Sequence, residues 1–343
     1  MKSTDEKLVK ISKIIEGLGF SLDEKQPHIG GERYLMTGNK LVLIGRQNAT
    51  NIKVVLKVSS HPLGKKEIER EKQARDILLS LAFANNTIFF PKELYFGQSG
   101  SHLIWVTQFI EQDKVFVARP IEEQFFTVLG AFEAQESFHA TTYEHIREVR
   151  DFFPIYSSKK YLDDFKKFGT AQIFIQAEKF LNAHSTTIDR YANHLVHTDF
   201  VPHNFRVNNH QVYMLDCSSV YFGNKYEGWA RFLNYMLIHN PNLEQLLSKY
   251  IRENRGEDEY LSLRLMRIYK IGYLLDYYAT SIAKTTGDLH TLTALRIDFW
   301  GKAMKAILDD APLERNMLKE YLINRDRLRS PEEKERQKEF AIA

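Results

Sequence analysis

Residues 194–216 read HLVHTDFVPHNFRVNNHQVYMLD, and they carry most of the information about the fold. An apolar strand ends at His197, so Asp199 begins a polar loop at a buried edge. Two short strands follow, joined by the turn-forming run Asn-Asn-His-Gln. A hairpin of this length returns its two ends to within a few ångströms. Asn204, just before the hairpin, and Asp216, just after it, are therefore expected to lie close together and near Asp199.

The three side chains bring oxygen atoms to one place. Hard oxygen ligands suit Mg²⁺, which usually takes only one or two protein ligands beside phosphates and water. The spacing therefore favours a site for Mg²⁺ and a phosphorylated ligand over a closed all-protein metal cage.

A second polar pair is predicted upstream. Lys57 lies in an apolar run that reads as a buried strand, and an unpaired buried ammonium is costly. Glu71, on the helix that follows, can supply the carboxylate, with Glu67 and Glu69 as competitors. The alternative is that Lys57 faces water from an edge strand.

These residues resemble the catalytic and metal loops of the protein-kinase-like fold, in its aminoglycoside phosphotransferase and choline kinase branch. That branch carries His-x-Asp-x4-Asn, then a hairpin and an aspartate. The matched residues are His197, Asp199, Asn204 and Asp216. Protein kinases carry H-R-D-x4-N and D-F-G instead; here Thr198 replaces the arginine and no A-P-E follows. The resemblance spans roughly residues 30–235.

The resemblance implies a two-lobed α+β fold, with a small antiparallel-sheet N-lobe containing one helix and a large, mainly helical C-lobe. We expect the N-lobe at 1–108, a hinge at 109–112, the C-lobe at 113–330 and a charged tail at 331–343. A short helix is expected to begin in that tail, because Ser330 is a good N-cap before proline and two glutamates.

The resemblance also implies a function. The chain would move the γ-phosphate of ATP or GTP, with Mg²⁺, to a hydroxyl of a small molecule such as an aminoglycoside, a sugar, a choline-like alcohol or an amino alcohol. Asp199 would orient the acceptor hydroxyl and take its proton. Asn204 and Asp216 would hold the Mg²⁺.

Nucleotide binding would use the N-lobe and the hinge. Lys57, paired with Glu71, would orient the α- and β-phosphates. The carbonyl of Gln108 and the amide of Ile110 would meet the adenine edge.

Two departures from the branch stand out. No glycine-rich phosphate loop is evident, and the turn at 37–40 is the candidate replacement, with Lys40 able to touch phosphate. The aspartate that follows the metal aspartate in the branch is replaced by the run Trp-Ala-Arg-Phe at 229–232, so the support of the catalytic loop is left open.

The remaining elements follow from periodicity. Helices are expected at 5–16, 65–84, 125–141, 160–183, 227–239, 242–253, 258–284 and 288–308. Strands are expected at 34–37, 41–45, 52–59, 93–96, 103–109, 205–207 and 212–215. The segment 17–31 reads as a loop.

Two other functional classes remain open. A nucleotide-binding pseudokinase or regulatory protein would need the same fold without turnover. A metal-dependent hydrolase would use zinc, since histidine and carboxylate suit that ion; its candidate ligands are His194, His197, Asp199 and His203. HExxH, GxSxG and CxxC are all absent.

Composition limits the partners. The formal net charge is +3, from 47 basic and 44 acidic residues, so bulk charge gives no indication of nucleic-acid binding. No apolar run reaches the about 18 residues of a membrane span. The lone Cys217, expected to be buried, fits a reducing compartment, and we expect a cytoplasmic protein. Nothing indicates an oligomeric state.

The acceptor cannot be read from the sequence. A polycationic aminoglycoside would need an acidic pocket, for which 257–259, Asp276 and Asp298 are candidates, but basic residues are interleaved with them. Tyrosines at 269, 273, 277 and 278 are expected in the core, or in part in a pocket wall.

Overall fold

The computed structural model describes residues 2–26, 39–81, 88–140, 147–169, 171–331 and 333–334. A five-stranded antiparallel sheet, in the order β1-β2-β3-β6-β5, forms the N-terminal part. Its strands are β1 (Phe20–Leu22), β2 (Leu41–Gln47), β3 (Lys53–Ser59), β5 (Glu93–Ser99) and β6 (His102–Gln108). Two helices accompany the sheet, α1 (Lys2–Gly17) and α3 (Pro62–Ser80).

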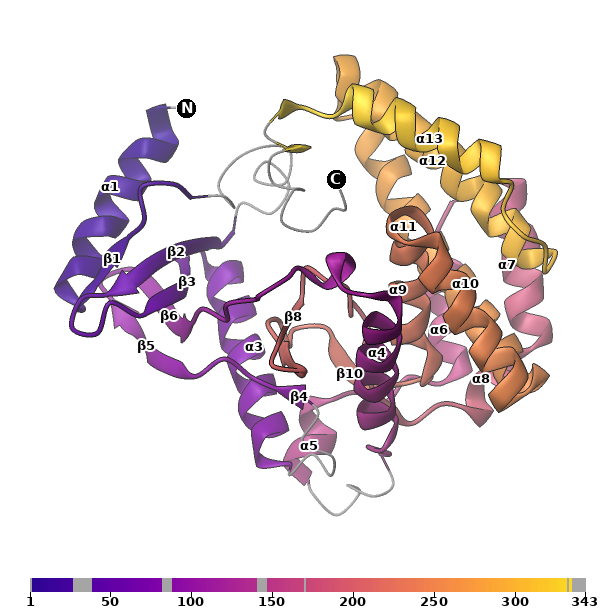
Figure 1. Cartoon of the computed structure of the whole chain (residues 1–343), viewed down its shortest axis with the longest axis horizontal. Coiled ribbons are helices and arrows are strands. Elements are labelled where there is room, and N and C mark those ends of the chain that lie inside the picture. Colours follow the sequence, from indigo (N-terminus) through magenta and orange to yellow (C-terminus); the bar gives the residue numbers. More distant parts are fainter. Residues whose placement is uncertain are drawn as a thin grey trace.

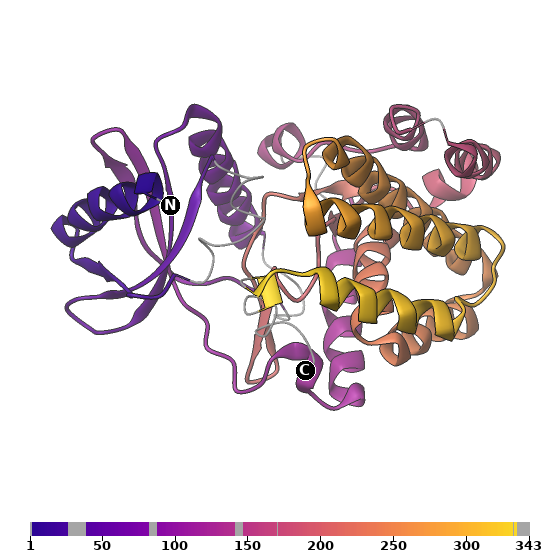
Figure 2. The same ribbon diagram turned by 90° about the horizontal axis from the view of Figure 1, so that it is seen from above.

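The rest of the chain is mainly helical. Figure 2 shows the sheet on one side, the helices on the other, and one segment crossing between them after β6. The first helices are η1 (Phe116–Ala118), α4 (Ile121–Glu136), α5 (Arg147–Phe152), α6 (Ser158–Phe165), α7 (Gln172–Ala183) and α8 (Ser185–Arg190). The later ones are α9 (Tyr226–His239), α10 (Pro241–Tyr250), the π-helix η2 (Ile251–Arg255), α11 (Glu257–Ile282), α12 (Gly287–Leu308) and α13 (Arg315–Leu328). This arrangement confirms the predicted two-lobed α+β class (Figure 1).

Two small sheets lie between the lobes. Strand β7 (His194–His197) pairs with β10 (Val220–Gly223), and β8 (Phe205–Asn208) pairs with β9 (Gln211–Met214). A short strand from the N-terminal part, β4 (Ile88–Phe89), joins β9 in parallel. The expected island of strands in a helical region is therefore confirmed, with β10 as an addition.

Two differences from the sequence prediction have local causes. Phe20 begins a strand inside the expected loop, because Gly19 turns the chain at φ +85° and lets Phe20 bury beside α1. The expected helix 160–183 is divided into α6 and α7, and Gly169, a poor helix former, lies between them. Helix α13 was not predicted. The strand expected at 34–37 lies outside the described residues.

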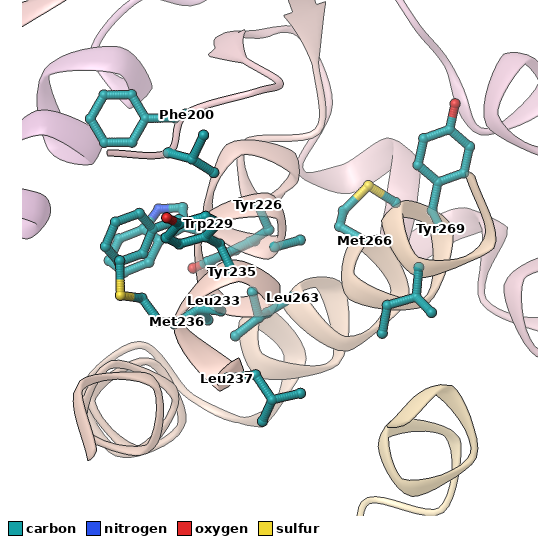
Figure 3. Close-up of a cluster of buried hydrophobic side chains, with 14 of the residues drawn as sticks. Phe200, Tyr226, Trp229, Leu233, Tyr235, Met236, Leu237, Leu263, Met266 and Tyr269 are labelled. Carbon is teal, nitrogen blue, oxygen red and sulfur yellow. The ribbon is translucent and has the colours of Figure 1, made fainter. Parts of the chain in front are cut away.

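The apolar core is divided into separate clusters. The sheet and α1 share one cluster, and the C-terminal helices share the largest. Figure 3 shows part of the latter, where Leu233 of α9 lies beside Leu263 of α11. A third cluster joins Ala74 and Leu78 of α3 to Leu195, Met214 and Cys217, so α3 packs against the helical part as well as against the sheet. The division at 1–108, 109–112 and 113–330 stays a prediction.

Candidate active site

Lys57 and Glu71 form a buried ion pair. Strand β3 lies between β2 and β6, so the reading of Lys57 as a water-facing residue on an edge strand is wrong. Its Nζ contacts Glu71 Oε1, and the two side chains are 12% and 1% exposed. The competitor Glu67 instead lies 3.8 Å from Lys40 Nζ, which is also 3.8 Å from Glu71 Oε2.

The start of α3 determines where Glu71 lies. Pro62 occupies the first turn, and His61 Nδ1 caps the helix by accepting the Leu63 N–H at 3.2 Å. A Cβ at Gly64 would lie 1.9 Å from the Asn39 carbonyl oxygen. The glycine therefore allows α3 to approach the turn that carries Lys40, and Glu71 follows two turns later.

Electrostatics couple this pair to Asp216. Burial, followed by the charge of Asp216, raises the pKa of Glu71 to about 7. Burial alone would lower the pKa of Lys57, but Glu71 and Asp216 outweigh it and raise that pKa above its ordinary value. For Asp216, burial is outweighed by Lys57 and Lys40, so its pKa is held well below the usual range. The site thus holds an ionised aspartate beside a protonated lysine.

His197 supports the loop through the backbone, as predicted. Its Nδ1 accepts the Asp199 N–H at 3.3 Å, so its Nε2 carries the proton that is donated to the Asp216 carbonyl. Burial lowers the pKa of this histidine, which keeps the ring neutral. One imidazole therefore joins the backbone of the loop at Asp199 to that of Asp216, the aspartate after the hairpin.

The hairpin closes as expected. Asn209 and His210 both have positive φ, 48° and 62°, as a two-residue type I′ turn requires. At the open end, the Leu215 N–H donates to the Asn204 carbonyl at 2.8 Å. Lys57 Nζ donates to the Leu215 carbonyl at 3.3 Å. The hairpin thus brings the Asn204 and Asp216 backbones together, and the N-lobe lysine reaches the same point.

Asp199 is held on both of its oxygens. Asn204 Nδ2 donates to Oδ2 at 2.8 Å, and Arg231 Nε, from α9, donates to Oδ1 at 2.7 Å. Burial opposes ionisation, but Arg231 outweighs it and holds the pKa of Asp199 below its usual value. Sequence reasoning missed this role. The sequence showed only that the aspartate of the branch is missing at 229–232. The signal that could have identified Arg231 is that it is the one charged residue in that run.

The residues fit Mg²⁺. Asn204 uses its amide nitrogen for both bonds to Asp199, which leaves the side-chain carbonyl oxygen as its acceptor. Asp216 Oδ1 accepts a hydrogen bond from the Ser218 N–H at 2.8 Å, and the carboxyl group stays ionised because its pKa is lowered. An amide oxygen and a carboxylate are the hard ligands that Mg²⁺ takes beside phosphate. The ligand assignment itself stays a prediction.

The histidines give the zinc reading no support. Within the described ranges, no group of three or more histidine, cysteine, aspartate or glutamate side chains could hold a metal ion. His194 Nδ1 bonds to the Glu136 carbonyl at 2.9 Å, and the His203 ring lies edge-on to Tyr235 at 5.4 Å. Cys217 is buried, as expected.

The predicted adenine partners lie where the chain leaves the sheet. The Gln108 N–H donates to the Lys92 carbonyl at 2.8 Å, and the Ile110 carbonyl accepts from Arg206 at 3.0 Å. The groups predicted to meet adenine are the Gln108 carbonyl and the Ile110 amide, and their contact with adenine stays a prediction.

A cavity of about 780 Å³ opens beside Asp199 and Asn204. Its walls come from α9, α11, α12 and α13. The four tyrosines at 269, 273, 277 and 278 all line it, so the pocket-wall reading is the better one. The acidic candidates at 257–259, Asp276 and Asp298 are not among its lining residues, so they do not form an acidic wall of this cavity.

Solved structures with this arrangement are small-molecule phosphotransferases. An apo thermostable mutant of aminoglycoside phosphotransferase APH(4)-Ia matches at 14% identity and a TM-score of 0.62, covering 87% of this chain and 98% of that one. This chain has the protein-kinase-like fold. A choline/ethanolamine kinase family protein from Mesorhizobium loti matches at 14% identity and a TM-score of 0.57, covering 93% and 99%. Amicoumacin kinase, with AMP-PNP and Ca²⁺, matches at 11% identity and a TM-score of 0.54, covering 91% and 96%.

The comparisons confirm the resemblance at the level of the fold. No protein-family model matches the sequence, and no curated protein matches it. Across the described part of the chain, no helix is both long and apolar enough to cross a membrane.

Proposed function

We propose that this protein transfers the γ-phosphate of ATP or GTP, with Mg²⁺, to a hydroxyl of a small molecule bound in the cavity. The observation that carries the proposal is the position of Asp199. It lies at the cavity, held by Asn204 and Arg231, while Lys57 of β3 bonds to the Leu215 carbonyl beside Asp216, where we propose that the nucleotide phosphates bind.

The chemistry follows from these positions. The acceptor oxygen bonds to the γ-phosphorus, and the bond from that phosphorus to the β–γ bridging oxygen breaks. Asp199 takes the hydroxyl proton and the nucleoside diphosphate leaves. Asn204 and Arg231 fix the orientation of the carboxylate, which matters more here than a raised pKa, since positioning supplies most of the barrier reduction.

The nucleotide side binds and orients phosphate. Lys57, aligned by Glu71, is suited to the α- and β-phosphates, and Lys40 lies beside the same pair. Asn204 and Asp216 would hold Mg²⁺, which when bound neutralises charge on the phosphate oxygens. The Gln108 carbonyl and Ile110 amide are our proposed adenine contacts.

The competing regulatory reading predicts binding without turnover. The complete set of Lys57, Glu71, Asp199, Asn204 and Asp216 favours an enzyme, because a binding protein has no need of a carboxylate aimed into a cavity.

The test measures nucleotide binding and ADP release on the full chain. Wild-type protein should bind ATP more tightly with Mg²⁺ than without it, and a panel of alcohols, sugars and amino alcohols should reveal an acceptor that stimulates ADP release. Asp216→Asn should lose the Mg²⁺ dependence of binding. Unchanged ATP affinity with and without Mg²⁺ in the wild type would contradict the proposal.

A further inference from the structure

The acceptor cavity has an unusual charge. Five cationic side chains line it, Arg231, Lys270, Arg296, Arg325 and Arg329, against the carboxylates Asp164, Asp199, Glu227 and Glu333. A pocket for a polycation would carry the opposite excess. The question is which of these charges are already compensated by neighbours in the protein.

The cationic side chains beside Asp199 and Glu227 are already paired with those carboxylates. Arg231 bonds to Asp199 at 2.7 Å. Lys270 lies 3.2 Å from Glu227, which also accepts hydrogen bonds from two tyrosine hydroxyls. Asp164 pairs with Lys160 at 2.8 Å, and Lys160 does not line the cavity. These charges leave no excess for a ligand.

The arginine triad, Arg296 of α12 with Arg325 and Arg329 of α13, is different. Arg325 and Arg329 both pair with Asp326, at 2.9 and 3.5 Å, and Asp326 is 57% exposed and lies outside the cavity. Glu333, which is buried in the cavity lining, is the one further carboxylate that acts on Arg329 among the described residues, so three arginines face two carboxylates. Arg325 Nη1 and Arg329 Nε are buried, and neither has a hydrogen-bond partner among the described residues. Buried guanidinium donors without acceptors are costly, so these atoms call for an anion.

The surroundings of the triad are electropositive. Burial, then Arg325, lowers the pKa of Arg329, even though Asp326 and Glu333 act in the other direction. The His239 ring stacks on Tyr235 at 4.1 Å and also lines the cavity; burial, then Arg325, Arg329 and Arg231, lowers its pKa to about 3. Two arginines of the triad and Arg231, the arginine that holds Asp199, therefore all act on the same buried histidine.

The aromatic walls do not favour a cationic ligand instead. Tyrosine faces attract cations, but three of those in the lining already have a protein cation over the ring. Arg296 lies over Tyr278 at 5.4 Å, Lys160 over Tyr156 at 5.3 Å and Arg325 over Tyr321 at 5.9 Å.

We infer that the acceptor carries an anionic group, a carboxylate or a phosphate, which the arginine triad binds while the acceptor hydroxyl lies at Asp199. Because it names the class of acceptor, this inference rests on the proposed function. Planar guanidinium groups suit both anions, since their paired N–H donors match two oxygens at once. The tyrosine-rich walls would contact the uncharged body of the acceptor.

The test is calorimetric titration of the full chain saturated with Mg·AMP-PNP. The nucleotide then occupies the proposed phosphate-binding groups, so the anion probes cannot bind there. The probes are sulfate, benzoate and the neutral isostere benzamide; sulfate stands for a phosphate group and benzoate for a carboxylate. We expect one of the anions to bind and benzamide to bind at least about tenfold more weakly.

The variants are Arg296→Gln and Arg329→Gln, with Arg325→Lys as a charge-preserving change at the most buried position. Arg327→Gln is the matched control, because it removes the same charge from an exposed position on α13 outside the cavity. Both glutamine variants of the triad should weaken anion binding at least about tenfold, and Arg327→Gln should not. Arg325→Lys keeps the charge but loses the paired donors, so it should weaken anion binding less than the glutamine variants do. Circular dichroism confirms that each variant is folded.

Three outcomes would overturn the inference: no binding of either anion, equal loss in Arg327→Gln, or weakened Mg·AMP-PNP binding in the triad variants, which would place the triad on the nucleotide. A protein that fails to bind Mg·AMP-PNP but still binds an anion through the triad would instead overturn the proposed function and retain the anion site.

Discussion

The proposed nucleotide side, around Lys57 and Asp216, and the proposed acceptor side, in the cavity, are built on opposite principles. On the nucleotide side, Lys57, Glu71 and Asp216 lie within one compact group, and each charge has an opposite charge close by. On the acceptor side, Arg325 and Arg329 pair with one exposed carboxylate, Asp326, and leave buried donors without an acceptor among the described residues. The first side is organised before any ligand arrives, whereas the second is completed by its ligand.

The largest expected effect is on the side that carries the chemistry. Asp199→Asn should lower turnover by about 10²–10⁴-fold, the usual contribution of a general base. ATP affinity should change little, because Lys57, Asn204 and Asp216 remain. Steady-state ADP release and ATP titration measure the two effects. Near-normal turnover would remove Asp199 from the mechanism, and lost ATP binding in a folded variant would make it a metal ligand.

Breaking the pair on the nucleotide side should cost stability. Lys57→Met leaves Glu71, which is 1% exposed, without its main partner, and should lower the free energy of unfolding by about 3–5 kcal/mol. Urea denaturation measures the loss. The double variant with Glu71→Gln is the control and should lose less than the single one. Equal losses would mean that the two side chains are not coupled.

Arg231 links the two sides, and its removal should have a smaller effect. Arg231→Gln takes one of two hydrogen bonds from Asp199, and since that carboxylate is 38% exposed, we expect turnover to fall by about tenfold. Arg231→Lys should recover part of the loss, with ATP affinity unchanged in both. A change in ATP affinity alone would assign Arg231 to the nucleotide.

The smallest expected effect is spectroscopic. His239 should stay neutral from pH 8 down to well below its ordinary pKa of about 6.5. Below about pH 6.5 the unfolded chain takes up a proton on this histidine and the folded chain does not. The free energy of unfolding therefore falls as the pH is lowered from about 6.5 towards 3. Nuclear magnetic resonance of the imidazole measures the titration. Arg329→Gln should raise the pKa of His239, and Arg327→Gln should leave it unchanged.

The same contrast explains what the sequence could reveal. His197, Asp199, Asn204 and Asp216 lie in one stretch whose hairpin dictates their proximity. Lys57 could be paired with Glu71 because a buried ammonium needs a carboxylate. These positions follow from local geometry and from the cost of burial.

The acceptor side has no such local signal. Arg231 comes from α9 and the triad from α12 and α13, and helix packing alone brings them to one cavity. The acidic residues at 257–259 were candidates for a cation-binding pocket only because of their charge. In the structure each of them pairs with a basic residue of the protein. Glu259, for example, is 2.7 Å from Lys225. Periodicity gave most helices, but not how their polar faces meet.

Helix α3 has a mechanical consequence. Its apolar face shares a core with Leu195 and Met214 of the helical lobe, while only Ile68 joins Leu103 and Trp105 of the sheet. The helix is thus joined to both parts of the chain, and to the sheet also by the ion pair of Lys57 and Glu71. Any rocking of the sheet against the helical part would have to loosen one of these two contacts of α3. The distance between Lys57 and Glu71 would report whether the contact with the sheet is the one that opens.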